Sequence, residues 1–210
     1  MKINECGRSM TEMLGVLAII SVLGTGGLVG YSKAMYKYKM HKTIGFVSDA
    51  IIDYELFVKQ NFGIDKNLKK QNMAQKLQEY GLVPNCEATT SIIAGNAYQV
   101  CRAPLGEISP RLSIQELSEG RQHTYELHVT FLQGAKQACS DFLVRNWDVV
   151  VPSKLWKKGS IHVASNTKDE VVYSATVKKL DISNVAATCE EVCSDSAYCS
   201  VVFNFKGIKY

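Results

Sequence analysis

The sequence predicts an α+β protein in which a long N-terminal helix leads into a domain with an antiparallel sheet and additional helices. Three patterns support this prediction. Residues 13–32 contain no charged side chain, residues 44–58 carry apolar side chains at helical spacing, and residues 125–131 alternate between apolar and polar side chains. A chain of 210 residues is long enough for one such helix and one domain with its own core.

The first pattern predicts a membrane-spanning helix. A helix rises about 1.5 Å per residue, so these 20 uncharged residues cover roughly 30 Å, the thickness of a bilayer's hydrocarbon core. Glu12 lies directly before the run, where a carboxylate is costly unless it has a partner. Because no proline interrupts residues 8–60, we expect one helix there, which spans the membrane at 13–32 and contacts the domain at about 44–60. Its domain-facing stripe consists of Ile44, Val47, Ile51, Tyr54 and Val58.

The residues around Glu12 carry a family resemblance. Gly7 is followed by Arg8-Ser-Met-Thr-Glu12 and then by the apolar sequence Met-Leu-Gly-Val-Leu-Ala-Ile-Ile-Ser-Val-Leu. This arrangement resembles the class III signal of type IV prepilins and type II secretion pseudopilins. The chain departs from that family at Arg8, where the family usually has phenylalanine, at Gly15 within the aliphatic run, and in lacking a proline midway along the helix.

The resemblance implies a route of processing and assembly. A prepilin peptidase would cut after Gly7, remove the leader at 1–7 and methylate the new amino terminus at Arg8. Glu12 would then be the fifth mature residue, whose role in the family is to face the terminal amine of a neighbouring subunit. The resemblance also implies a pilin-like fold, in which the long helix continues into the globular domain.

From the resemblance we expect a structural subunit of a type IV pilus-like or type II secretion pseudopilus filament, assembled through its N-terminal helix. The expected partners are the prepilin peptidase, other pilin or pseudopilin subunits, and the inner membrane. The alternative is an uncleaved membrane-anchored periplasmic binding module. In both cases we expect a single pass through the inner membrane, with the α+β domain at 61–210 in the periplasm or in an extracellular filament.

Composition and motifs disfavour other classes of function. The net charge is only +4 and the lysines are spread along the chain, so the sequence indicates no nucleic-acid partner. It contains no G-x-S-x-G, no Walker loop and no H-E-x-x-H, so it predicts neither an enzyme nor a cofactor. Four scattered histidines are interpreted as ordinary surface side chains: His41, His123, His128 and His162.

The distribution of basic residues disagrees with export of the domain. Four lysines follow the apolar run, whereas two basic residues precede it. They are Lys33, Lys37, Lys39 and Lys42 on one side, and Lys2 and Arg8 on the other. The positive-inside rule alone would place the domain in the cytoplasm. The prepilin-like signal and the cysteine content favour export, and this is the orientation we expect.

The chain has seven cysteines, and removal of the leader with Cys6 would leave six. An even number beyond a membrane segment favours disulfides in an oxidising compartment over six reduced core cysteines. They are Cys86, Cys101, Cys139, Cys189, Cys193 and Cys199. We expect a first disulfide between Cys86 and Cys101, which would close a loop of 16 residues.

For the other four cysteines the sequence leaves the pairing open. Cys189 and Cys193 lie one helical turn apart and face the same way, so a bond between them is strained. We favour Cys139–Cys193 and Cys189–Cys199 over the swapped pairing. Zinc binding by Cys189, Cys193 and Cys199 is an alternative, but their spacing is not a standard one and no histidine lies nearby, so no metal site is predicted.

The rest of the chain predicts shorter elements. Helices are expected at 68–80, at 135–146, and after an N-cap at Asp181 or Ser183. Strands are expected at 97–102, 125–131, 149–151, 160–164, 171–177 and 200–205. His128 should lie on the polar face of its strand. The segment 104–120 is predicted to be rich in loops, with a helical turn at 113–117.

Overall fold

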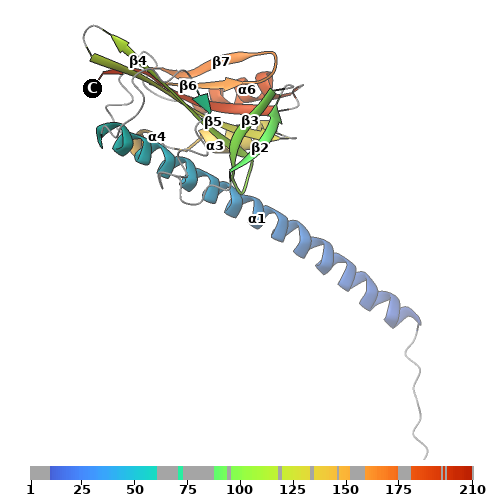
Figure 1. Ribbon diagram of the computed structural model, residues 1–210. Helices are drawn as coiled ribbons and strands as arrows, with labels where there is room; N and C mark the ends of the chain where they lie inside the picture. The colour runs from blue at the N-terminus through green and yellow to red at the C-terminus, as the bar shows by residue number, and fades with distance from the viewer. Residues whose placement is uncertain are drawn as a thin grey trace, which may run out of the picture. The chain divides into compact units, whose positions relative to one another are not determined.

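The computed structural model describes residues 10–60, 71–72, 88–93, 96–117, 120–132, 135–145, 147–151, 159–174, 181–194, 196 and 198–209. Helix α1 (Met10–Gln60) is continuous for 51 residues, so the predicted long helix is present up to its expected end. The chain divides into two compact units, one ending at Lys39 and the other beginning at Met40. The first part of α1 therefore belongs to one unit and its second part to the other (Figure 1).

The second unit is built on one sheet with the strand order β2-β3-β4-β5-β8-β6-β7, and β1 pairs with β4. The strands are β1 (Gln71–Asn72), β2 (Ala88–Ile93), β3 (Asn96–Arg102), β4 (Glu107–Leu117), β5 (Gly120–Leu132), β6 (Gly159–Ala164), β7 (Asp169–Ser174) and β8 (Tyr198–Lys209). Every pairing among these described strands is antiparallel. The prediction of an α+β fold with an antiparallel sheet is thus confirmed.

The two faces of the central strands differ in polarity, because side chains along a strand alternate between them. On β5 the buried apolar residues are Tyr125, Leu127, Val129 and Phe131. The register places them opposite the buried β8 residues Phe205, Phe203, Val201 and Cys199. The opposite face of β5 carries Glu126, His128 and Thr130, so the predicted strand and the placement of His128 on its polar face are confirmed.

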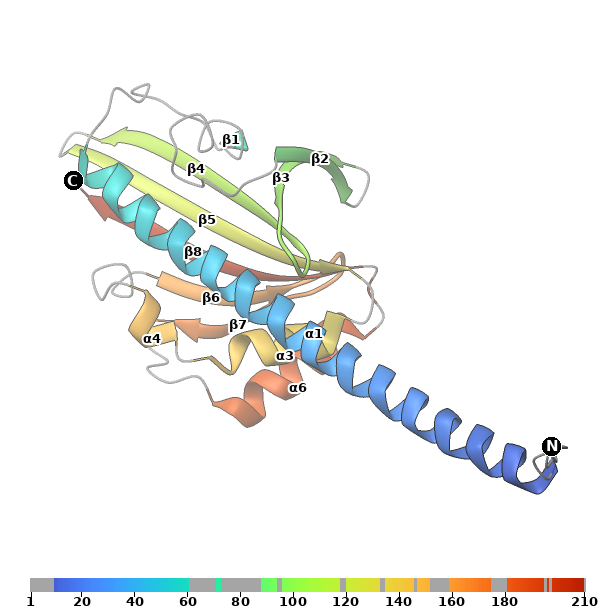
Figure 2. The same ribbon diagram turned by 90° about the horizontal axis from the view of Figure 1, so that it is seen from below.

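Helices lie on the apolar face of the sheet (Figure 2). The second part of α1 contributes Tyr54, whose ring stacks on Tyr125 with the ring centroids 3.7 Å apart. Helix α3 (Ala135–Leu143) contributes Phe142, and the single turn α4 (Trp147–Val150) contributes Trp147. Both rings contact Phe203 of β8 edge to face. Helix α6 (Ile182–Cys193) is tied to the start of β8 by a disulfide.

The domain-facing stripe of α1 is largely as predicted. Val47, Ile51 and Tyr54 are buried, Ile44 is half-buried, and the side chain of Val58 lies outside the described residues. The buried stripe also includes Met40, Thr43 and Ala50. These positions repeat every three or four residues, which is the helical period. The contact of α1 with the domain core therefore begins at Met40.

The segment 104–120 was expected to be rich in loops with a helical turn at 113–117, and this prediction is wrong because β4 occupies 107–117. All eleven residues of β4 are in register with β5. On the other side of β4, β3 pairs with Glu107 and Ile108, and β1 pairs with Arg111 and Leu112. Pro110 falls between these two pairings, so its missing N–H costs no ladder hydrogen bond on that side.

Residues 149–151 were predicted to be a strand, and this prediction is also wrong because 147–150 form α4. The Trp147 ring is buried between Phe142 and Phe203, and its indole N–H donates to the carbonyl of Phe142 over 3.1 Å. Burial of the Trp147 ring stabilises a helical turn here, although the valines that follow it are β-branched and favour a strand.

The remaining predictions have mixed outcomes. The strands expected at 97–102, 160–164 and 200–205 are present within β3, β6 and β8. The strand at 171–177 is present as far as Ser174 in β7, and its last residues lie outside the described part of the chain. Of the helix expected at 68–80, Gln71 and Asn72 form strand β1 because they pair with β4, and the rest lies outside the described residues.

The N-cap of α6 was predicted to be Asp181 or Ser183, and it is Asp181. Its carboxylate accepts a hydrogen bond from the Ser183 N–H over 3.0 Å. The helix expected at 135–146 is present as α3 over 135–143.

Candidate functional site

The first part of α1 presents an apolar surface that nothing in the described chain covers. Between positions 13 and 29 its large apolar side chains are each 53% to 70% exposed. By length and composition this helix can cross a bilayer. The hydroxyls of Ser21, Thr25 and Ser32 donate to carbonyls four residues earlier, so these polar groups are satisfied within the helix, as a lipid environment requires.

Glu12 lies in the first turn of α1 and is exposed. A negative charge there is favoured by the partial positive charge of the helix N-terminus. The sequence-predicted cleavage residues Gly7 and Arg8 lie outside the described residues, together with the rest of the leader. Of the three residues assigned to processing and assembly, the structure thus places Glu12.

The cysteine pairing differs from the one the sequence favoured. The structure joins Cys139 of α3 to Cys189 of α6, with their Cα atoms 5.9 Å apart, and Cys193 to Cys199 of β8, with their Cα atoms 5.3 Å apart. The predicted pairs Cys139–Cys193 and Cys189–Cys199 are therefore wrong, and the swapped arrangement is present. Both Cα separations are normal for disulfides.

The packing of α6 explains this pairing. Helix α6 packs against α3, to which Cys189 is bonded, whereas Cys193 ends the helix, six residues before Cys199. Cys101 is also disulfide-bonded. Its expected partner, Cys86, lies outside the described residues, so that pairing stays a prediction.

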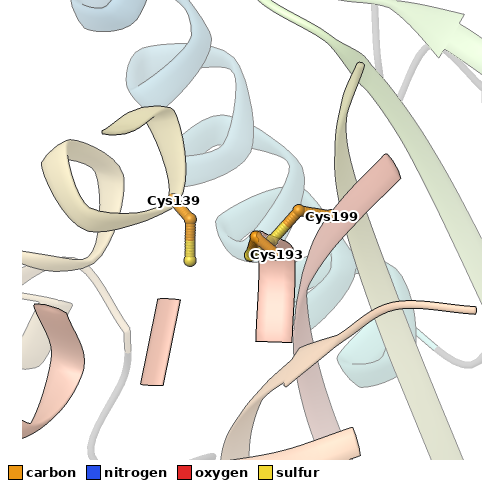
Figure 3. Close-up of side chains that lie close together, drawn as sticks. All are labelled: Cys139, Cys193 and Cys199. Atoms are coloured by element: carbon orange, nitrogen blue, oxygen red, sulfur yellow. A yellow bond between two sulfur atoms is a disulfide. The ribbon is translucent and has the colours of Figure 1, made fainter. Parts of the chain in front are cut away.

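The two disulfides form one compact sulfur cluster. The Sγ atoms of Cys139, Cys193 and Cys199 (Figure 3) all lie within 4.8 Å of one another. Cys189 is bonded to Cys139. Four of the predicted disulfide residues, from α3, α6 and β8, are thus brought together. All four side chains are at most 5% exposed.

Two histidines on the polar face of the sheet hold hydrogen-bonded positions. His128 Nε2 lies 3.4 Å from Glu126 Oε2, and the Asn204 side-chain amide donates to the other oxygen of Glu126 over 3.4 Å. His162 bridges Ser160 Oγ, at 2.8 Å, and Asp169 Oδ1, at 3.1 Å. Both histidines were interpreted as ordinary surface side chains. The structure adds that each is hydrogen-bonded to its neighbours and only about one fifth exposed.

Ser160, His162 and Asp169 contact one another in the same sequence as the serine, histidine and aspartate of a serine hydrolase. The surroundings of the three residues differ from those of such an active site. The Asp169 side chain is 66% exposed, which leaves its bond to the imidazole open to water. Ser160 sits on β6, which pairs with β7 on one side and β8 on the other, so the nearby backbone N–H groups serve the sheet. This arrangement fixes the orientation of His162.

A pocket of about 600 Å³ lies beside the second part of α1. It is lined by His41, Lys42, Gly45, Phe46, Asp49, Arg102, Ala103 and Pro104. The turn between β3 and β4 is fixed to α1 because the Leu105 N–H donates to Thr43 Oγ1 over 3.0 Å. In the same turn Gly106 has φ +91°, and a Cβ there would overlap the carbonyl oxygen of Thr130.

The charged side chains of the pocket have both signs. Of the lining residues, Lys42 and Arg102 are basic and Asp49 is acidic. Arg145, which is not part of the lining, donates to the His41 ring over 2.9 Å. Such a site suits a small molecule with anionic or mixed charge. Sequence reasoning missed it because Arg102 is distant from α1 in the chain, and the basic run ending at Lys42 was the one available signal.

Burial affects two titratable groups where α1 meets the sheet. It raises the pKa of the Tyr125 hydroxyl well above its ordinary value, and the nearby carboxylate of Asp53 adds to the effect. Burial also raises the pKa of Asp53, with a further contribution from Asp49 one helical turn earlier. Both shifts mark the α1–sheet contact as a place where negative charge is disfavoured.

No protein-family model, curated protein or solved structure matches this chain.

Proposed function

We propose that the chain is a structural subunit of a type IV pilus-like or type II secretion pseudopilus filament. The observation that carries the proposal is helix α1, which joins a long exposed apolar surface to a second part built into the core of the domain. One continuous helix thus carries both an apolar surface suited to lipid or to other subunits and residues of the domain core. The signal-like arrangement of Gly7, Arg8 and Glu12 adds the position of processing.

The proposed mechanism is physical. In the inner membrane the first part of α1 is solvated by lipid, and in a filament the same surface contacts equivalent helices of other subunits. After cleavage by the prepilin peptidase, the carboxylate of Glu12 faces the terminal amine of a neighbouring subunit. That ion pair offsets part of the cost of removing both charges from water and disfavours axial registers in which the charges do not meet.

The N-terminal residue of the mature chain tests processing. The proposal expects mature chains that begin at Arg8, and Gly7→Val should leave the leader attached, because the peptidase requires a small residue at the cleavage site. Mature chains that begin at Met1, or normal cleavage of the Gly7→Val variant, would contradict the proposal.

Glu12→Ala tests assembly separately. It should leave membrane insertion and cleavage intact but reduce filament yield by at least about tenfold, since an unpaired amine in an apolar contact costs more than about 1.4 kcal/mol. Ser21→Ala is the matched control, because Ser21 is also exposed on the first part of α1 but bonds only within its own helix. Equal filament yields from both variants would rule out the charge pairing.

A second candidate is the uncleaved, membrane-anchored periplasmic binding module. The pocket that contains Lys42, Asp49 and Arg102 favours it, since a pocket of about 600 Å³ with both signs of charge is large enough for a small ligand. This candidate requires Met1 to remain on the mature chain and predicts no filaments. The mature N-terminus therefore separates the two candidates.

A further inference from the structure

Two disulfides lie next to each other in one buried site, so that sulfurs from different pairs are close together. Disulfides need proximity only within each pair. Here three sulfurs from two different pairs, those of Cys139, Cys193 and Cys199, all lie within 4.8 Å of one another. The fourth, from Cys189, is bonded to the first. Figure 3 shows Cys139 of α3 near Cys193, at the end of α6, and Cys199 of β8.

This proximity fits a tetrahedral zinc ion. A zinc–thiolate bond is about 2.3 Å long, so the sulfurs of a four-cysteine site lie about 3.8 Å apart. The sulfur of Cys139 lies within 4.8 Å of those of Cys193 and Cys199, so these two separations exceed the zinc spacing by at most about 1 Å. Within each disulfide the sulfurs must move apart from about 2 Å to about 3.8 Å after reduction, which rotations of the cysteine side chains can supply. Cys189 and Cys193 are one turn apart on α6, which is the separation that lets both reach one ion.

The surroundings also fit a structural rather than a catalytic metal site. The four cysteines are at most 5% exposed, so four protein ligands would close the coordination sphere without an open position for water. Apolar neighbours on the same helices, such as Phe142 and Val192, are buried as well. Slow exchange of the metal is the expected consequence.

We propose that the reduced chain binds one zinc ion through Cys139, Cys189, Cys193 and Cys199. Two disulfides are first reduced to four thiols by two equivalents of an added phosphine, each of which gives two electrons and takes an oxygen from water to become phosphine oxide, while the two waters supply the four thiol protons. Zinc then replaces four protons, which are released to solution, and gives a tetrathiolate site. In this form zinc holds together the same three elements that the disulfides hold in the oxidised form.

The site would make the fold independent of the redox state of its compartment. The basic residues after the apolar run favour a cytoplasmic domain, whereas the cysteine count favours export. With a domain on the reducing side the cluster would hold zinc, and on the oxidising side it would hold disulfides. The zinc site does not rest on the proposed filament function, so either can fail while the other stands.

The test uses the full chain in detergent, reduced by a phosphine without oxygen, mixed with zinc sulfate and then freed of unbound metal. One zinc ion per chain should remain, and cobalt in its place should show the visible bands of a tetrahedral tetrathiolate site. Replacement of any one of the four cysteines by serine should weaken zinc binding by more than about 100-fold. Loss of a residue that only supports a ligand costs about 10- to 100-fold, so the larger loss identifies a direct ligand.

Cys101→Ser is the matched control, because Cys101 is equally buried but belongs to another disulfide. That variant should keep full zinc binding. Loss of binding in it, retention of binding in the Cys193→Ser variant, or a reduced chain that holds no zinc would each overturn the site. If reduction unfolds the chain, addition of zinc should restore the fluorescence of buried Trp147, and failure to do so would overturn it too.

Discussion

Replacing Ile51 by alanine tests whether the second part of α1 belongs to the domain core. The Ile51 side chain is fully buried, while that of its neighbour Ile52 is 43% exposed. Ile→Ala removes three carbons, worth about 0.8 kcal/mol each on burial, or about 2.4 kcal/mol, and the cavity left at position 51 adds to this. We therefore expect Ile51→Ala to lower the free energy of unfolding by about 3 to 4 kcal/mol.

Ile52→Ala is the matched control. It changes helix propensity by the same amount, so the difference between the two variants isolates burial. About half of its side chain is already in water and no closed cavity forms, so the loss should be about 1 kcal/mol. Urea unfolding of the full chain in detergent, followed by tryptophan fluorescence, measures both. Equal losses at the two positions would refute the assignment of this part of α1 to the core.

Three further predictions concern single side chains in the second unit. Tyr125→Phe should raise stability by about 1 kcal/mol, because within the described chain the buried Tyr125 hydroxyl has no hydrogen-bond partner. Asp53→Asn should raise the melting temperature at pH 7 but not at about pH 4. The pKa of Asp53 is raised in the folded chain, so the wild-type protein loses stability as the pH rises from the ordinary pKa of an aspartate through the raised one, and asparagine removes that loss. Asp181→Ala should cost about 1 kcal/mol through loss of the α6 cap, whereas Asp181→Ser should cost little.

Thermal unfolding checks each of these predictions. A clear loss of stability in Tyr125→Phe would show that its hydroxyl is bonded in solution. A gain from Asp53→Asn that is the same at both pH values would remove charge as its cause. Equal losses from the alanine and serine variants at position 181 would show that the cap contributes no hydrogen bond.

The sequence by itself determined the elements whose signal is local. An unbroken run without proline gave helix α1 as far as Gln60, and period-three and period-four spacing identified Val47, Ile51 and Tyr54 as buried. Period-two alternation identified β5 and the polar position of His128. In each case the pattern and the observed element depend on neighbours within a few residues, so the sequence carries enough information.

Tertiary structure alone decided β4, α4 and the cysteine pairing. Strand and helix propensities differ by only about 1 kcal/mol per residue, so full pairing with β5 outweighs Pro110 in β4, and burial of Trp147 outweighs the preference of the residues after it for a strand. The spacing of Cys189 and Cys193 showed that they share a helix face but not which partner each meets. That choice depends on how α6 packs against α3 and β8, and those contacts form between segments far apart in the chain.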